Sequence, residues 1–232
     1  MKKTKEVLFP PTIFNINKPP GITSTDVIRH FKRNLPSGFG KIGHFGTLDP
    51  FADGVLLVGI AGACRLNEYI HSSFNKVYRA TGRLGVSTVT GDLTVLPNQK
   101  ISEESFSLLK QSITTKMIND IFRTFLGDYW QRPHYFSATK KDGVPLYKLA
   151  RKGEFIEKEK VLRHIDSIKL IRFNFPEIEF KVTVKSGTYI RQLFVDIAER
   201  LQTIGSLESL TRVEIGGCTI SKSISENNWP IK

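Results

Sequence analysis

The sequence predicts a mixed α+β fold. Segments with strand-like and helix-like patterns alternate irregularly along the chain, without a repeated β-α-β unit. An apolar content of 40% and a charged content of 24% are ordinary for a globular protein. With 232 residues, the chain can form one large domain or two small ones around a substantial core.

The N-terminal half contains the first strand and the first helix of this prediction. Residues 12–17 read as a strand that ends at Lys18-Pro-Pro-Gly. Ser24 can cap a helix whose apolar stripe consists of Val27, Ile28, Phe31 and Leu35. Residues 76–86 are expected to form a strand and a turn.

A second helix is predicted to begin at Thr115 and to stop at Gly127. Its apolar positions at helical spacing are Met117, Ile118, Ile121, Phe122, Phe125 and Leu126. Residues 128–138 have no clean periodicity, and we interpret them only as a loop and a strand.

Residues 178–185 alternate as a half-buried strand should, and a turn at residues 186–188 leads into a third helix. The strand's predicted inward face is Ile178, Phe180, Val182 and Val184. The helix carries Ile190, Leu193, Phe194, Ile197, Ala198 and Leu201 on one stripe.

The chain is strongly basic, because 34 Lys and Arg residues outnumber 22 Asp and Glu residues to give a net charge of +12. Such a surplus favours a polyanionic partner, and both nucleic acid and an anionic membrane surface would fit. Residues 54–64 form the longest apolar stretch, which is too short to span a bilayer. The basic N-terminus is not followed by the apolar region of a secretory signal.

Cys64 and Cys218 lack metal-ligand spacing, and we expect two buried free thiols. The five histidines are scattered and form no mixed Cys/His cluster. We therefore expect a cytoplasmic protein with no bound metal and no cofactor.

One segment, Gly43-His-Phe-Gly-Thr-Leu-Asp-Pro-Phe-Ala-Asp-Gly54, concentrates the residues suited to chemistry. Its glycines permit unusual backbone conformations, and Asp49 precedes Pro50, which disfavours helix at the aspartate. One interpretation is an acid held on a stiff, irregular loop that carries chemistry. The other is a tight turn leading into a buried helix. The segment by itself leaves both open.

This segment resembles the nucleophile motif of the bacterial tRNA pseudouridine-55 synthase family, with every fixed position present. Four further segments resemble that family in the same order, so that the resemblance runs from about residue 13 to 220. They are Lys18-Pro-Pro-Gly-Ile-Thr-Ser24, Lys76-Val-Tyr-Arg-Ala80 with Arg83-Leu-Gly85, Arg132-Pro-His-Tyr-Phe-Ser-Ala138, and Ser186-Gly-Thr-Tyr-Ile-Arg191.

The resemblance implies the pseudouridine-synthase fold, a mixed, mostly antiparallel sheet flanked by helices and loops. It implies a single catalytic domain over residues 1–232, in which residues 97–112 look like a surface insertion. The implied partner is the T-arm and T-loop of tRNA, where uridine 55 becomes pseudouridine without a cofactor. We expect a monomer with no obligate protein partner and no membrane association.

The family's catalytic residues correspond here to Asp49, Arg191 and Tyr78. Arg191 would lie about three residues after a cap at Thr188, where the helix dipole disfavours a cation. A nearby carboxylate would offset that cost, and the family pairs this arginine with the catalytic aspartate; the alternative is a solvated arginine. Tyr78 matches the tyrosine that stacks on the flipped base, and an ordinary core aromatic is the competing interpretation.

Four residues match substrate-binding positions of the family: Lys18, His44, Tyr189 and Leu210. His44 corresponds to a residue that packs against the RNA loop, and Tyr189 to one that lines the uridine pocket. Without the family match, Leu210 would be interpreted as an ordinary core residue. Lys18 would support the active-site loop or bind a phosphate, and a plain surface lysine is nearly as good an explanation. A basic stretch is a candidate for phosphate contact; it consists of Lys140, Lys141, Lys148, Arg151 and Lys152.

The chain departs from the family pattern at Val89, which replaces an acid, and at Asn17, which replaces an aspartate. The sequence also leaves no room for the C-terminal PUA module of longer members, from which we expect weaker or more salt-sensitive tRNA binding.

Two other functions compete with that of a tRNA-modifying enzyme. One is a non-catalytic RNA-binding or tRNA-folding protein, and the other is a glycoside hydrolase with Asp49 and Asp53 as its carboxylates.

Overall fold

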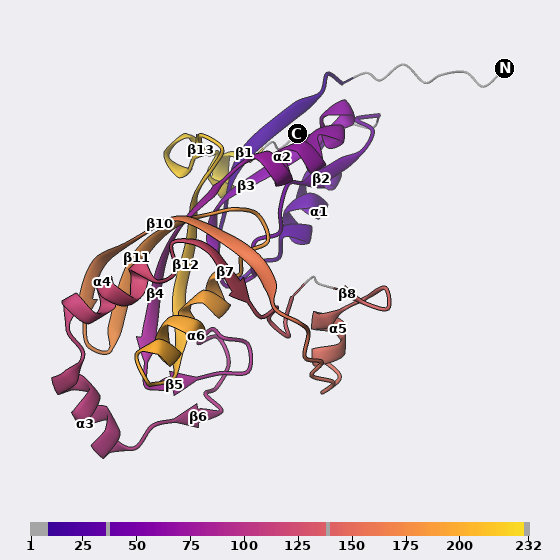
Figure 1. Ribbon diagram of the computed structural model, residues 1–232. Helices are drawn as coiled ribbons and strands as arrows, with labels where there is room; N and C mark the ends of the chain where they lie inside the picture. Colours follow the sequence, from indigo (N-terminus) through magenta and orange to yellow (C-terminus); the bar gives the residue numbers. More distant parts are fainter. Residues whose placement is uncertain (1–8, 36–37, 138–139, 230–232) are drawn as a thin grey trace. The chain divides into compact units, whose positions relative to one another are not determined.

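The computed structural model describes residues 9–35, 38–137 and 140–229, whose helices and strands are labelled in Figure 1. They form two compact units. The described parts of Met1–Tyr78 and Leu210–Lys232 make the first unit, and Arg79–Ser209 makes the second. Two strands, β4 (Lys76–Leu84) and β12 (Gly205–Ile215), continue from one unit into the other. The single domain over residues 1–232 stays a prediction.

β3 (Asp53–Ile60) is the central strand of the first unit. It pairs antiparallel with β1 (Thr12–Lys18) and with β2 (Ile42–His44). Its first residues pair in parallel with β12, whose end pairs with β13 (Cys218–Thr219). The predicted first strand is thus confirmed, and the sheet is mixed. The apolar run after Asp49 is a buried strand, so the alternative of a buried helix is wrong.

α1 (Ser24–Asn34) buries three of the four predicted stripe residues, since Leu35 lies just past its end and is only partly buried, and its cap also differs from the prediction. Thr23 caps the helix through a capping box with Asp26, so the prediction of Ser24 as the cap is wrong by one residue. Phe31 is fully buried, and its ring lies 5.3 Å from that of Phe14 on β1. The remaining helices of this unit are α2 (Asn67–Ser73) and the short 3-10 helices η1 (Ala61–Leu66), η2 (Ile220–Lys222) and η3 (Glu226–Asn228).

The sheet of the second unit has the strand order β12-β4-β11-β10-β7. Its strands include β11 (Glu177–Val184), β10 (Val161–Asn174) and β7 (Gly127–Gln131). The alternation predicted for residues 178–185 is confirmed, because all four inward residues are buried. Short hairpins are formed by β5 (Val86–Ser87) with β6 (Gln99–Lys100), and by β8 (Lys140–Lys141) with β9 (Val144–Pro145).

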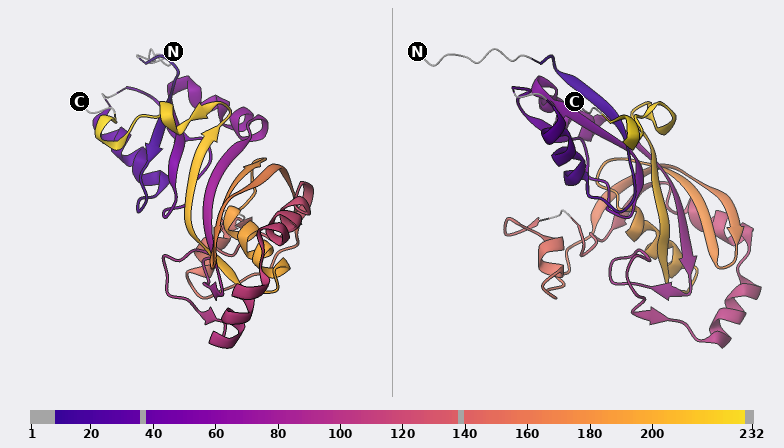
Figure 2. Two further views of the ribbon diagram at one scale, coloured as in Figure 1. Left: turned by 90° about the vertical axis from the view of Figure 1, so that its left-hand side faces the viewer. Right: turned by 180° about the vertical axis from the view of Figure 1, so that it is seen from behind.

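α4 (Thr115–Arg123) and α6 (Ile190–Arg200) cover one face of that sheet, as Figure 2 shows. Phe180 of β11 contacts both helices, since its ring lies 5.7 Å from Phe122 of α4 and is stacked at 6.1 Å on Phe194 of α6. α4 ends before the predicted Gly127, which instead begins β7 with a φ of 79°. The N-cap of α6 is Tyr189, and Thr188 instead donates its hydroxyl to the carbonyl of Lys185.

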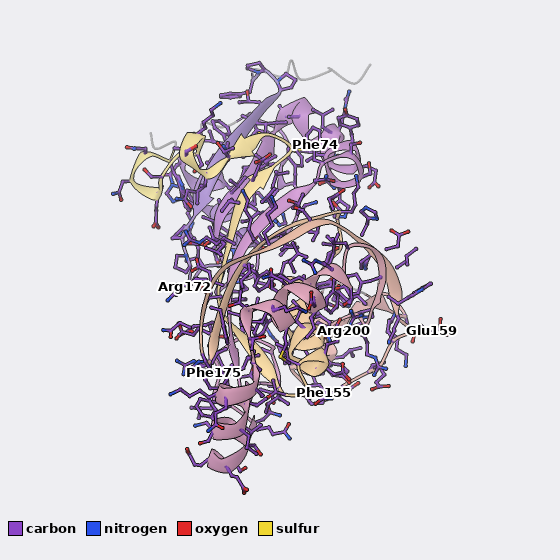
Figure 3. All side chains as sticks on the ribbon, turned by 60° about the vertical axis from the view of Figure 1, so that its left-hand side comes forward. Phe74, Phe155, Glu159, Arg172, Phe175 and Arg200 are labelled. Atoms are coloured by element: carbon purple, nitrogen blue, oxygen red, sulfur yellow. The ribbon has the colours of Figure 1, made fainter. Side chains whose placement is uncertain are left out.

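Residues 97–112 include β6 and α3 (Glu103–Ser112), and none of the helix's ten residues is buried. The ring of Phe106 on α3 lies 4.9 Å from that of Phe175, which is labelled in Figure 3. α3 therefore meets the rest of the second unit through a small contact, and the interpretation of residues 97–112 as an insertion stays a prediction.

α5 (Leu146–Ala150) follows β9.

Charged side chains on β4, β10 and β11 form a network of ion pairs within the second unit. Glu179 accepts from Arg79 at 2.5 Å and from Arg172 at 3.2 Å, and Figure 3 shows Arg172 at the edge of the molecule. These two arginines explain why Glu179, predicted on the outward face, is only 7% exposed.

The two cysteines are free but only partly buried, so the prediction of buried thiols is wrong. Among the residues that the structure describes, no helix is long and apolar enough to cross a membrane. The same residues contain no group of three His, Cys, Asp or Glu side chains placed to hold a metal ion. Ala138 and the basic N-terminal residues lie outside the described ranges.

Candidate active site

Asp49 lies in an irregular segment between β2 and β3, and the backbone carbonyls around it are all hydrogen-bonded. All five carbonyls from Gly46 to Pro50 accept a hydrogen bond, although none of these residues belongs to a helix or strand. The carbonyl of Asp49 itself accepts from the Ala52 N–H at 3.1 Å. The acid is therefore carried by a loop with one defined conformation, as the first interpretation of the motif predicts.

Arg212 binds the part of the loop that precedes Asp49. Its guanidinium is 1% exposed and donates to the carbonyls of Gly46 at 3.1 Å and Thr47 at 3.2 Å. Its Nε donates to the carbonyl of Val55 at 2.8 Å. Gly54 is required here, since its φ is +102° and a Cβ would lie 2.3 Å from the Arg212 carbonyl oxygen.

Ser24 binds the residue directly before Asp49. Its hydroxyl oxygen accepts from the Leu48 N–H at 2.9 Å and donates to the Leu48 carbonyl at 3.1 Å. The side chain is 2% exposed. Since Ser24 is the first residue of α1, this pair of bonds ties the loop to the helix.

Lys18 binds the other side of the loop and is fully buried, so the alternative of a surface lysine is wrong. Its Nζ donates to the carbonyls of Pro19 at 2.7 Å and Ile22 at 2.8 Å, with Pro50 at 3.4 Å. Burial lowers the pKa of Lys18 from 10.5 to about 8, although Asp53 and Asp49 act in the opposite direction. These contacts favour the role of a loop support over that of a phosphate ligand.

The other predicted residues of the first unit lie on β2, β4 and β12. His44 is half-buried and lines a cavity of about 440 Å³ together with Lys32, Lys41 and Phe39. Burial, and after it the charge of Arg212, lowers the pKa of His44 and so favours the neutral imidazole. Tyr78 and Leu210 are 7% and 5% exposed, in the strands that the two units share.

Arg191 lies in the second unit and is 4% exposed, so the alternative of a solvated arginine is wrong. Its guanidinium donates to the carbonyls of Thr90 at 2.6 Å and Phe136 at 3.0 Å. Asp92, itself 5% exposed, lies 3.7 Å from the same guanidinium. Tyr189 is half-buried and is the N-cap residue of α6. The ion pair between Arg191 and Asp49 stays a prediction.

The sequence of this chain is similar to a known family over most of its length. A family model described as "TruB family pseudouridylate synthase (N terminal domain)" matches residues 32–190, well over half of the chain. The tRNA pseudouridine synthase B of Clostridium kluyveri is 38% identical over 92% of this chain and 70% of that protein. The chain belongs to the TruB family of pseudouridylate synthases.

Other members of the TruB family and solved structures agree with this assignment. The tRNA pseudouridine synthase B of Bacteroides fragilis is 37% identical over 96% of this chain and 91% of that protein. A chain in the crystal structure of a Cbf5-Nop10-Gar1 complex matches with a TM-score of 0.66 and 25% identity. That match covers 93% of this chain but only about half, 52%, of the other. The predicted pseudouridine-synthase fold is therefore confirmed.

Sequence reasoning missed several buried residues that contact predicted site residues or the segments that carry them. They are Ser24 in its role on the loop, Asp92, Gln131 and Arg212. Arg212 and Asp92 lie outside the motifs quoted above, and a charged residue reads as solvated until its burial is known. Gln131 directly precedes the Arg132 motif and had no distinguishing pattern around it.

Proposed function

We propose that this protein is a tRNA pseudouridine synthase that converts uridine 55 in the T-loop of tRNA to pseudouridine. Membership in the TruB family supports the reaction class. The observation that carries the residue assignment is the Asp49 loop, whose backbone is held by Lys18, Ser24 and Arg212. A reacting group that is held in this way needs no reorganisation when substrate arrives.

In this proposal the carboxylate of Asp49 acts on the ribose of a flipped-out uridine. The bond from C1′ to N1 breaks, the base turns, C1′ bonds to C5, and the C5 proton is lost while N1 gains one. Asp49 either attacks C1′ or removes a sugar proton to give a glycal, and both roles suit an ionised carboxylate. The atoms of substrate and product balance without any co-reactant.

Tyr78, Tyr189 and Arg191 complete the proposed site. Removing a base from its stack costs a few kcal/mol, for which an aromatic face compensates, and we assign this contact to Tyr78. Tyr189 and Leu210 line the uridine pocket, and His44 packs against the RNA loop. Arg191 pairs with Asp49. Its guanidinium is buried near a helix N-terminus, where a nearby carboxylate stabilises a cation, and this supports the pairing.

We further infer that the T-arm of tRNA is the bound partner and that the protein works as a cytoplasmic monomer. The net charge of +12 supports a polyanionic partner. The names of the relatives from Clostridium kluyveri and Bacteroides fragilis support tRNA as that polyanion.

Tritium release tests the proposed reaction. Unmodified tRNA with tritium at C5 of its uridines should release label to water when the protein is added, and tRNA with cytidine at position 55 should not. In the variant Asp49→Asn, single-turnover release should fall on the order of 10⁴-fold while the Kd for tRNA changes less than about threefold. The matched control is Asp120→Asn on the exposed face of α4.

Three results would overturn parts of the proposal. Folded wild-type protein that binds tRNA but releases no label would make the chain a non-catalytic RNA-binding protein. Equal release by Asp49→Asn and Asp120→Asn would remove Asp49 from the reaction, and release from the cytidine-55 tRNA would refute the choice of position.

A further inference from the structure

Gln131 makes two hydrogen bonds to the backbone of a single residue, Tyr189. Its Oε1 accepts from the Tyr189 N–H at 2.9 Å, and its Nε2 donates to the Tyr189 carbonyl at 3.0 Å. The side-chain amide thus imitates the exchange of bonds between facing residues of an antiparallel sheet. Two bonds to one residue fix its position and its rotation together.

The amide of Gln131 has little freedom to leave this arrangement. The residue is 1% exposed at the end of β7, and its Nε2 also contacts the hydroxyl of Tyr129. Burial raises the pKa of Tyr129, which keeps that hydroxyl protonated. Since the N–H of Tyr189 must meet an acceptor, the orientation of the Gln131 amide is determined.

Tyr189 is the position from which α6 starts. The helix has no side-chain cap of its own, and the Tyr189 carbonyl also accepts the first intrahelical bond, from the Leu193 N–H at 3.0 Å. Helix N-termini leave several N–H groups unsatisfied, and capping side chains normally serve them. Here Gln131, which is 58 residues away in the sequence, binds the residue from which the helix begins.

The start of α6 also determines where Arg191 lies. Its guanidinium is held at the far end by the carbonyls of Thr90 and Phe136. A displacement of the helix start would have to stretch or break these bonds, because Arg191 follows Tyr189 by only two residues.

We propose that Gln131 is a positioning residue of the synthase reaction. By holding the backbone of Tyr189, it sets where the Tyr189 ring and the Arg191 guanidinium lie when the uridine is bound. This inference rests on the proposed function, because positioning has a measurable meaning only if the protein turns over RNA. Gln131 itself touches neither substrate nor reacting atoms in this assignment.

The first test compares Gln131→Leu, which removes both bonds at similar size, with Val182→Ala, which weakens the buried core on β11. Both are assayed at a temperature where circular dichroism shows them folded. Gln131→Leu should lower the single-turnover rate of tritium release about 10- to 100-fold, with the Kd for tRNA within about threefold of wild type. Val182→Ala should keep a rate within about threefold of wild type even though its Tm falls.

The second test uses Gln131→Glu and a pH series. A protonated carboxyl group can both accept from the Tyr189 N–H and donate to its carbonyl, whereas a carboxylate cannot donate. The ratio of variant to wild-type rate should therefore rise at least about fivefold as the pH falls from about 8 to about 6. Taking the ratio cancels the pH dependence that comes from groups present in both proteins. One such group is Asp196 on α6, whose pKa burial raises to about 6.

The outcomes separate this inference from the proposed function. No release by wild type ends the proposed function itself. With active wild type, a folded Gln131→Leu within threefold of its rate overturns the positioning role, as does a loss confined to tRNA affinity. If Gln131→Leu does not fold, the pH series decides, and a flat ratio for Gln131→Glu refutes the inference.

Discussion

At the scale of single residues, the first unit is unusual in burying several cations around one loop. Lys18 is fully buried, Arg212 is 1% exposed and Lys76 is 5% exposed. Burial, and after it the charge of Arg212, lowers the pKa of Lys76 from 10.5 to about 8. Buried charges lower stability unless they are fully compensated. Burial of these cations therefore opposes folding, while Lys18 and Arg212 hold the loop through their hydrogen bonds.

The buried amine of Lys18 should make stability depend on pH. Its pKa is lower in the folded chain, about 8, than the 10.5 of an unfolded one. Between these values the unfolded chain binds the extra proton, so the free energy of unfolding rises with pH as far as Lys18 is concerned. In Lys18→Met this contribution is lost.

Urea unfolding measures this effect. The difference in unfolding free energy between wild type and Lys18→Met should shift in favour of wild type by about 2 kcal/mol from pH ~7.5 to pH ~9.5. Lys32→Met, at an exposed position on α1, should show no such change. A constant difference across this range would mean that Lys18 keeps an ordinary pKa in the folded protein.

At the scale of elements, the pairing of β2 with β3 brings two glycines opposite each other, Gly43 and Gly59. They have different surroundings. A Cβ on Gly59 would lie 2.4 Å from the Phe45 ring, whereas a Cβ on Gly43 would meet nothing within 4 Å. Phe45 is packed in a core cluster with Val55 and Leu57 and directly precedes the loop that carries Asp49.

Alanine substitutions at this pair should therefore differ in stability. Gly59→Ala should lower the free energy of unfolding by about 1–3 kcal/mol, because the Phe45 ring must move within a packed core. Gly43→Ala should stay within about 0.5 kcal/mol of wild type. Chemical denaturation of the two variants gives the comparison, and similar losses from both would contradict the packing argument.

Elements with a strong periodic pattern were predictable from the sequence, and their ends were less so. Residues 178–185 alternate because one face is buried, and a period of two is visible in the sequence itself. The cap of α1 was assigned one residue too late, because Thr23 and Ser24 are both good capping residues. Only the fold shows that the Ser24 hydroxyl serves Leu48.

The site was predictable to the extent that it lies in short motifs. Asp49, Tyr78 and Arg191 were proposed through motif matches, whereas the contacts around the proposed site join distant positions. Arg212 bonds to Gly46, 166 residues away, and Gln131 bonds to Tyr189. No local pattern encodes such pairs, because each partner is ordinary in its own surroundings.

At the scale of the whole molecule, the charge of +12 predicts strongly salt-dependent binding of tRNA. The basic stretch around α5 is our candidate for part of this interaction, and Lys148 and Lys152 are exposed there. Each phosphate contact contributes about 0.7–0.9 to the slope of log K against log salt concentration.

Neutralising two of these lysines should reduce that slope. In Lys148→Gln combined with Lys152→Gln, the magnitude of the slope from titrations at several salt concentrations should fall by about 1.6. Lys110→Gln on α3 is the matched control and should leave the slope as in wild type. An unchanged slope in the double variant would place the phosphate contacts elsewhere on the protein.

The hydrogen-bonded carbonyls from Gly46 to Pro50 have a thermodynamic consequence for RNA recognition. Ordering a flexible backbone opposes association by about 1–2 kcal/mol for each residue that becomes fixed. This segment is already fixed when the polypeptide folds, so encounter with RNA adds no such penalty here. Its rigidity is a property of the free protein, and in the proposed reaction the energy of RNA contacts remains available to take the uridine out of its stack.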